Sequence, residues 1–279
     1  MIAIAGTAYD PAPDLPGVEY RFGKDMVEAL HTMHNGGRPP VHGYATKDQL
    51  MIELDLRDKA TEAMAKANAD DDILRYPTRR GDPPDGQLDP KYWDKVGFYA
   101  FLPTSGARPT PAVRSIFGGM DNVLECNSAM VAVEYGSMLE AMGNRAFDNR
   151  VSGGSLIISP YHQPPRGVDQ HPLFKEGMIE TVAITSARDL IPGDWVYFRN
   201  IADYLTKHPN GFWSGEHSLY LCDGKFQGFG TTVVTEGGMR QKLLDSYNAG
   251  LPAAQQKQIE DVPGLQRYAH RPVVENIVK

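Results

Sequence analysis

A glutamate and a cysteine stand side by side where a helix is expected to begin, in the run Leu124-Glu125-Cys126-Asn127-Ser128-Ala129-Met130. From Ala129 to Met142 apolar residues recur at helical spacing. Asn122 is a plausible N-cap, and Glu125 three residues later completes a capping box. Cys126 is therefore expected near the positive end of a helix dipole, which stabilises a thiolate and lowers a thiol pKa from about 8.5 toward neutrality. A thiol placed there can act as a nucleophile.

Simpler roles are open for both residues. Free cysteine is among the most buried residue types, so Cys126 also fits an inert core thiol. Glu125 also fits a helix-capping residue with no part in chemistry. The chain has only one other cysteine, Cys222, which reads as a strand residue of the core. Two cysteines make no disulfide framework.

A nucleophilic thiol needs a base, and the polar candidates lie downstream: His162, His171, His208, Glu216 and His217. Glu216 and His217 are neighbours at the start of an expected strand, so their side chains point to opposite faces and only one can face the thiol. Composition favours His217, because histidine titrates near neutrality. A carboxylate does the same work if burial raises its pKa or if it shares a proton with the thiol.

The elements that must position these groups change character along the chain. Helical spacing predicts a helix from about Lys47 to Asn68, a short helical candidate near 24–33 and another helix from Met239 to Tyr247. β-Branched, aromatic and leucine-rich runs predict strands at 155–158, 181–185, 194–198, 217–222 and 231–235. Asp223-Gly224 between two of these runs is a strong hairpin signal. The expected class is α+β, with the nucleophile at a helix N-terminus packed on a mostly antiparallel sheet.

The chain is expected to form one catalytic domain over residues 1–279. At 279 residues and 41% hydrophobic composition it can bury a sizeable core. The stretch from about 70 to 95 holds an acidic run and the turn-rich Gly81-Asp82-Pro83-Pro84-Asp85-Gly86, which indicate a solvated loop or an insertion. The tail after Gly250 is polar and contains prolines.

Charge and motifs exclude several classes of partner and cofactor. A formal charge of -7 argues against nucleic acid or an acidic membrane as the main partner. The first six residues are apolar but lack a basic segment and end too soon for a signal peptide or membrane span, so a cytoplasmic location is expected. No calcium loop of the D-x-[DN]-x-[DN]-G type is present in the sequence.

Two segments resemble motifs of one enzyme family. Phe212-Trp213-Ser214-Gly215-Glu216-His217-Ser218-Leu219 resembles the W-x-G-E-N segment of the spore-coat type of bacterial protein-glutamine gamma-glutamyltransferase, a small calcium-independent transglutaminase. The run from Leu124 to Met130 resembles that family's F-E-C-A-T-A-I. Further parallels occur in the same order: Met1-Ile2 with Gly6, Glu53-Leu54 with Leu56-Arg57, and Gly193-Asp194 with Val196-Tyr197-Phe198-Arg199-Asn200. The resemblance covers nearly the full chain.

The resemblance implies a fold related to the papain-like and NlpC/P60 hydrolases, with the site in a tunnel. Cys126 would be the nucleophile and Glu216, in place of a histidine, its proton partner. Glu125 would be a secondary carboxylate, and Trp213 would line the tunnel and shield the acyl-enzyme from water. One departure is that the family's supporting histidine has no counterpart in the segment from Lys225 to Gly230.

The implied reaction joins glutamine and lysine side chains of protein substrates through a cysteine thioester, without a cofactor and in a spore-associated or cytoplasmic setting. Attack by water in place of lysine would make the enzyme a deamidase. The same residues also fit an NlpC/P60-like cysteine peptidase or an inactive structural relative.

Overall fold

The computed structural model describes residues 2–11, 26–27, 30, 42–77, 81–119, 121–152 and 154–278. Its largest sheet has six strands in the order β12-β11-β10-β9-β13-β8. Each neighbouring pair in this sheet is antiparallel, as predicted. The strands are β8 (Ile179–Ala183), β9 (Trp195–Arg199), β10 (Gly215–Tyr220), β11 (Lys225–Gly228), β12 (Val234–Thr235) and β13 (Gly264–Pro272).

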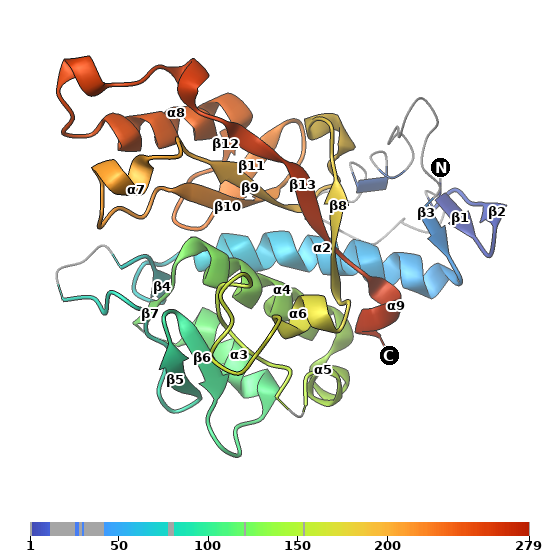
Figure 1. Cartoon of the computed structure of the whole chain (residues 1–279). Helices are drawn as coiled ribbons and strands as arrows, with labels where there is room; N and C mark the ends of the chain where they lie inside the picture. Colours follow the sequence, from blue (N-terminus) through green and yellow to red (C-terminus); the bar gives the residue numbers. More distant parts are fainter. Residues whose placement is uncertain are drawn as a thin grey trace.

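Helices cover both faces of this sheet (Figure 1). The long helices α2 (Lys47–Ala67) and α4 (Cys126–Met142) pack against each other on one face, and α8 (Glu236–Asn248) lies on the other. Strand β9 shows why both faces are covered. Its side chains alternate between the two faces of the sheet, so each face carries apolar side chains. Trp195 joins the core on the α4 side, whereas Val196 and Phe198 join the core beneath α8. The sheet therefore separates two hydrophobic cores.

Smaller sheets and helices surround the six-stranded sheet and the three helices that cover it. Three small sheets are formed by β1 (Ile2–Ile4) with β2 (Thr7–Ala8) and β3 (His42–Tyr44), by β4 (Leu74–Arg75) with β7 (Asn122–Val123), and by β5 (Trp93–Gly97) with β6 (Ala100–Pro103). The shorter helices are α3 (Pro109–Gly118), α5 (Asn144–Arg150), α6 (Pro172–Lys175), α7 (Tyr204–Lys207) and α9 (Val274–Ile277), with 3₁₀ turns η2 (Ala187–Asp189), η3 (Ala253–Gln255) and η4 (Ile259–Asp261). None of the described helices is long and apolar enough to cross a membrane.

A buried ion-pair network fastens α2 to the sheet. Arg57, only 1% exposed, pairs with Glu53 at 2.9 Å and with Asp194 at 2.8 Å. Asp194 lies directly before β9 and also accepts from Arg271 of β13 at 2.7 Å. Buried charges need such partners, because an unpaired one loses its hydration. The network holds the α2 side of the molecule against two central strands.

Several predicted elements are confirmed with small shifts. The helix predicted from Lys47 to Asn68 is α2, capped by the Thr46 side chain, which accepts from the Gln49 amide. The helix predicted from Met239 to Tyr247 is α8. The Asp223-Gly224 hairpin joins β10 to β11, with both residues at positive φ. These signals were strong because each depends on local sequence.

Other predictions were wrong. Residues 155–158 form no strand, and Ile158 makes only an isolated bridge to Phe101. The run at 231–235 contains only the two residues of β12, and Cys222 lies in the turn after β10. The polar, proline-containing tail after Gly250, for which no strand was predicted, contributes β13 to the middle of the sheet. The helical candidate near 24–33 lies largely outside the described residues.

The segment from 70 to 95 is not wholly a solvated loop. Leu74 and Arg75 form the buried strand β4, which pairs in parallel with β7 immediately before the cysteine. Arg75 is held by Asp82 at 2.6 Å and by Asp121 at 3.1 Å. The segment thus brings the residue after β4, Tyr76, toward the beginning of α4.

Candidate active site

Cys126 is the first residue of α4, and Glu125 is its N-cap. The Glu125 carboxylate accepts from the amide of Ser128 at 2.6 Å and from that of Asn127 at 2.8 Å. The predicted Asn122 N-cap was wrong, because Asn122 lies in β7 and its side chain donates to the carbonyls at the end of α3. The placement of the thiol at the helix N-terminus is as expected, but a different residue caps the helix.

Glu216 on β10 faces the thiol, and His217 faces away from it, as the strand alternation predicts. The Glu216 side chain is 1% exposed, and its Oε2 accepts from the Tyr76 hydroxyl at 2.9 Å. The nearby Phe229 amide opposes the rise of the Glu216 pKa, and Oε1 has no hydrogen-bond partner among the described residues. Gly228 makes the arrangement possible, since a Cβ there would lie 2.4 Å from Oε1 of Glu216.

The buried His217 ring belongs to an aromatic cluster on the other side of the strand. The indole nitrogen of Trp195 donates to its Nδ1 at 2.9 Å, and the Asn127 carboxamide lies 3.0 Å from its Nε2. Burial, with weaker repulsion from His270 and His162, lowers the pKa of His217 well below the ordinary value. A neutral, weakly basic ring that points away from the thiol is a poor general base. Only the backbone amide of His217 reaches the sulfur, to which it donates.

The thiol and the carboxyl both favour their neutral forms. Burial raises the pKa of Cys126 well above its ordinary value, and the charges of Glu216 and Glu125 raise it further. These outweigh hydrogen bonds from the His217 amide and Tyr76, so the predicted lowering of the thiol pKa by the helix was wrong. Burial likewise raises the pKa of Glu216. When the pair carries one negative charge, the thiol and the carboxyl share that charge and exchange the one remaining proton.

Tyr76 is the site residue that sequence reasoning missed. Its half-buried hydroxyl is hydrogen-bonded to the Cys126 thiol as well as to Glu216. The local signal was weak: a short apolar run, Ile73-Leu74-Arg75-Tyr76 before Pro77, inside an otherwise acidic segment. Nothing in that run indicates that it pairs with the strand preceding the cysteine.

Trp213 lies beside the site and not on the thiol. It is half-buried and lines a cavity of about 180 Å³ together with Phe212, Tyr76 and Phe229. The rings of Tyr76 and Phe229 stack with centroids 4.9 Å apart. This pair contributes to the wall of the cavity, and the Tyr76 hydroxyl reaches the thiol and the carboxyl.

The other histidine candidates have structural partners. Nδ1 of the exposed His162 lies 3.0 Å from the Asn127 carboxamide. His171 is buried and caps α6, and its other ring nitrogen is 3.1 Å from the Ile157 carbonyl. Nε2 of His208 lies 2.7 Å from the Tyr247 carbonyl, at the C-terminal end of α8. None of the three contacts Cys126 directly in the described hydrogen-bond network.

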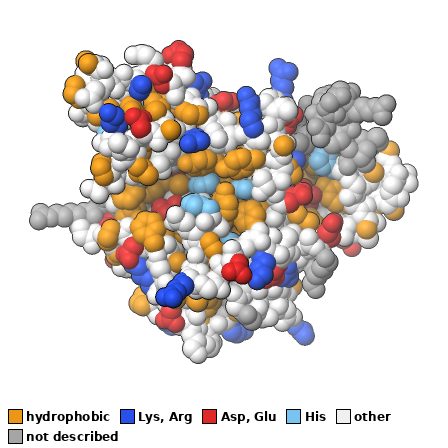
Figure 2. All heavy atoms as spheres, viewed as in Figure 1, with side chains coloured by type: hydrophobic (Ala, Val, Ile, Leu, Met, Phe, Trp, Pro, Cys, Tyr) orange, Lys and Arg blue, Asp and Glu red, His pale blue; other side chains and the backbone are white. Residues whose placement is uncertain are grey.

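Histidine side chains gather in a hollow in the middle of the face shown in Figure 2, bordered by hydrophobic side chains. The rings of His162, His217 and His270 all pack around Tyr161. Within the described residues no group of three or more His, Cys, Asp or Glu side chains is arranged to hold a metal ion.

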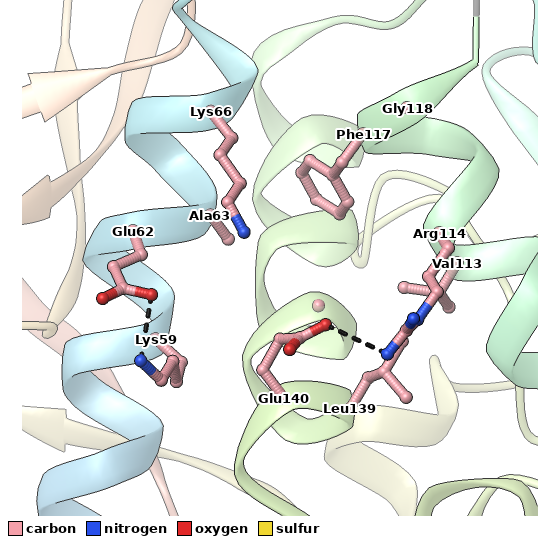
Figure 3. Close-up of a pocket in the computed structure, with 11 residues that line it drawn as sticks. Lys59, Glu62, Ala63, Lys66, Val113, Arg114, Phe117, Gly118, Leu139 and Glu140 are labelled. Atoms are coloured by element: carbon pink, nitrogen blue, oxygen red, sulfur yellow. Dashed lines mark hydrogen bonds and ion pairs between the residues drawn. The ribbon is translucent and has the colours of Figure 1, made fainter. Parts of the chain in front are cut away.

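A separate cavity of about 280 Å³ lies between α2, α3 and the C-terminal half of α4 (Figure 3). Its charged side chains are largely paired, Lys59 with Glu62 and Arg114 with Glu140. Phe117 and Leu139 supply its apolar wall. Because Cys126 begins α4 and this cavity adjoins the other half of the helix, it is distinct from the thiol site.

Comparison of the sequence with known proteins matches it to one family. Residues 1–261 match the family described as protein-glutamine gamma-glutamyltransferase. A protein of that name from Halalkalibacterium halodurans is 28% identical over 251 residues, which cover 88% of this chain and 76% of the relative. Another from Bacillus mycoides is 23% identical over 230 residues, covering 81% of this chain and 72% of the relative.

A solved structure has a similar fold. It is the transglutaminase from Geobacillus stearothermophilus without its C-terminal extension, and it aligns with a TM-score of 0.62 and 21% identity. The alignment covers 84% of this chain and 97% of that one.

Proposed function

Because the chain belongs to the protein-glutamine gamma-glutamyltransferase family and is therefore an acyltransferase, we propose that Cys126 is its nucleophile and Glu216 its proton acceptor. One observation carries this assignment: the thiol and the carboxyl are buried together, at 8% and 1% exposure, with one tyrosine hydroxyl bonded to both. Burial makes the charged form of either group unfavourable, so a proton moves between them at little cost.

Acylation begins from the singly charged pair in which Glu216 is ionised. The thiol proton passes to the Glu216 carboxylate, and the sulfur attacks the side-chain carboxamide carbon of a protein glutamine. A C–S bond forms, and the carbonyl oxygen takes the negative charge. Glu125 already occupies the amides of Asn127 and Ser128, so the Cys126 amide is the first-turn donor left to bind this oxyanion. The C–N bond then breaks, the nitrogen takes the proton from Glu216, and ammonia leaves a thioester.

Transfer completes the cycle. A lysine amine attacks the thioester carbon, its proton goes to Glu216, and the C–S bond breaks to release the thiolate. The proton on Glu216 returns to the sulfur, and the product is an isopeptide bond between two protein side chains. No step requires a metal or an organic cofactor, in keeping with a calcium-independent enzyme.

The two remaining predicted site residues have supporting roles. Both oxygens of Glu125 hold the first turn of α4, and Sγ of Cys126 lies 3.7 Å from its Oε2. Protonation of Glu125 would weaken this cap, so Glu125 positions the nucleophile and does not replace Glu216 as the base. Trp213 supplies an apolar wall beside the site, which limits access of water to the thioester.

The finer fold assignment is also part of the proposal. A cysteine at the start of a helix packed on an antiparallel sheet is the arrangement expected of a papain-like or NlpC/P60-related fold. A carboxylate on the strand facing the helix takes the place of the usual histidine. The proposed substrates are proteins with accessible glutamine and lysine side chains, in a spore or in the cytoplasm.

Incorporation of a labelled primary amine into a glutamine-rich protein tests this function, with ammonia release measured in the same reactions. Cys126→Ala is expected to be inactive. Glu216→Gln is expected to lose about 10²–10⁴-fold in rate, the usual contribution of general acid–base catalysis. His217→Asn serves as the matched control, because its side chain leaves the same strand on the opposite face.

Full activity of Glu216→Gln with loss of activity in His217→Asn would show that the base was assigned wrongly. Release of ammonia by the wild-type enzyme without uptake of amine would identify a deamidase instead.

A further inference from the structure

The Tyr76 hydroxyl connects the two acids of the proposed site. It donates to Oε2 of Glu216 at 2.9 Å and is hydrogen-bonded to the sulfur of Cys126. The Glu216 carboxyl accepts from Tyr76 on Oε2, and its Oε1 is buried without a hydrogen-bond partner among the described residues. The tyrosine oxygen therefore joins the thiol to the Glu216 carboxyl, while the thiol also donates to Oε2 of Glu125 at 3.7 Å.

The tyrosine ring is held in place on two sides. Phe229 stacks on it with an interplanar angle of 25°. Gly230, at a φ of 71°, lies so close that a Cβ there would be 2.7 Å from Cδ2 of Tyr76. The Gly230 amide donates to the Asn68 side chain at 2.6 Å, and Asn68 donates in turn to the Gly228 carbonyl at 3.1 Å. The C-terminal end of α2 thus fixes the loop that clamps the ring.

Three consecutive residues position both members of the acid–tyrosine pair. Gly228 leaves room for the Glu216 carboxyl, Phe229 stacks on the Tyr76 ring, and Gly230 leaves room for that ring. This is the segment in which no histidine occurs. The small residues and the aromatic ring of this segment hold the Tyr76 hydroxyl beside the Glu216 carboxyl.

We propose that Tyr76 is a catalytic residue that relays the proton between Cys126 and Glu216, an inference that rests on the proposed transglutaminase function. In the relay the S–H bond of Cys126 breaks and its proton binds the Tyr76 oxygen, while the Tyr76 O–H bond breaks and its proton binds Oε2 of Glu216. One proton has moved from sulfur to carboxylate. Cys126 is left as a thiolate, Tyr76 is neutral, and Glu216 is a neutral acid.

The two transfers are concerted, so that no tyrosinate forms. Burial and the neighbouring charges of Cys126 and Glu216 hold the pKa of Tyr76 well above its ordinary value, which opposes a free phenolate. A hydroxyl that donates one proton while it accepts another never carries the negative charge of a phenolate. Once the thiolate exists, the regenerated hydroxyl can donate to it, which adds to the amide of His217.

Tyr76→Phe tests the relay, because it removes only the hydroxyl and keeps the ring that stacks on Phe229. Ammonia release from a glutamine-containing peptide is expected to fall about 100-fold or more in kcat, with KM unchanged. The pH profile of Cys126 alkylation by iodoacetamide is expected to move to higher pH. The double variant Tyr76→Phe/Glu216→Gln is expected to be no slower than Glu216→Gln alone, because both changes break one relay.

Tyr247→Phe is the matched control, because it also removes a tyrosine–carboxylate hydrogen bond of 2.9 Å, to Asp203, at a distant place. It is expected to leave both rates unchanged. A wild-type rate and alkylation profile in Tyr76→Phe would overturn the relay, and so would losses that simply multiply in the double variant. If the wild-type protein releases no ammonia from any glutamine donor, the proposed function fails, while the alkylation profiles still test the role of Tyr76.

Discussion

The buried carboxyl of Glu134 should make the free energy of unfolding fall steadily as the pH rises from 4.5 to about 8. This carboxyl lies in the middle of α4 and is 4% exposed. Burial raises its pKa from 4.5 to about 8, against the attraction of Arg57 and with a smaller contribution from the charge of Asp194. Between these two values the folded protein keeps a proton that the unfolded chain releases. Unfolding therefore releases a proton in this range, and stability falls as the pH increases from 4.5 to about 8.

The size of the effect follows from the shift. Each pH unit within this range changes the free energy of unfolding by about 1.4 kcal/mol. Glu134→Gln keeps the shape of the neutral acid and does not titrate. Relative to wild type, the variant should gain about 3 kcal/mol between the lower end of the range and pH 7 and about 4 kcal/mol by pH 8.

Urea denaturation at several pH values measures this difference, with the free energy of unfolding extrapolated to water. The slope of the difference against pH is the decisive quantity, because a fixed offset reflects only how well the new amide packs. Glu140→Gln, at a carboxyl 47% exposed on the same helix, is the control and should parallel wild type between pH 6 and 8. Parallel curves for Glu134→Gln and wild type would refute the reasoning.

Three further predictions concern the ion pairs and the walls of the site. Asp194→Asn should lower the free energy of unfolding by about 3–5 kcal/mol in a denaturant titration, because it leaves the buried Arg57 and the partly buried Arg271 without their shared partner. Gly228→Ala should lower kcat about 10²-fold in the ammonia assay, since its Cβ would displace the Glu216 carboxyl. Gly237→Ala at the start of α8, where the nearest atom to the new Cβ would be Thr235 Oγ1 at 4.0 Å, should leave the rate unchanged. Trp213→Ala should raise the ratio of hydrolysis to amine transfer, measured as ammonia released per amine incorporated.

Local signals predicted how Cys126 is placed and that Glu216 and His217 point to opposite faces of their strand. Helical spacing after Cys126 and the strand alternation at Glu216 and His217 placed the thiol at a helix start and one side chain on each face. The resemblance to a family then selected Glu216, where composition favoured His217. The structure agrees on the faces, because Glu216 meets the thiol side while His217 is bonded to Trp195.

Features that depend on contacts between residues far apart in the sequence could not be predicted from local sequence patterns. Tyr76 approaches Cys126 only because β4 pairs with β7, and its own surroundings in sequence are acidic and turn-rich. Strand β13 has polar residues and a register shift between Leu265 and Ala269, which interrupt the alternation that marks a strand. The thiol pKa was misjudged because the helix N-terminus is visible in sequence, whereas burial beside two carboxylates is not.

Mass spectrometry of the acid-quenched enzyme tests the central claim most directly. After brief incubation with a glutamine-containing peptide and no amine, the fragment containing Cys126 should carry the peptide less one ammonia, and later addition of a primary amine should remove it. Tyr76→Phe and Glu216→Gln should accumulate this adduct much more slowly than wild type. Release of ammonia with no adduct on Cys126, or with the adduct on another residue, would contradict the assignment of Cys126 as the nucleophile.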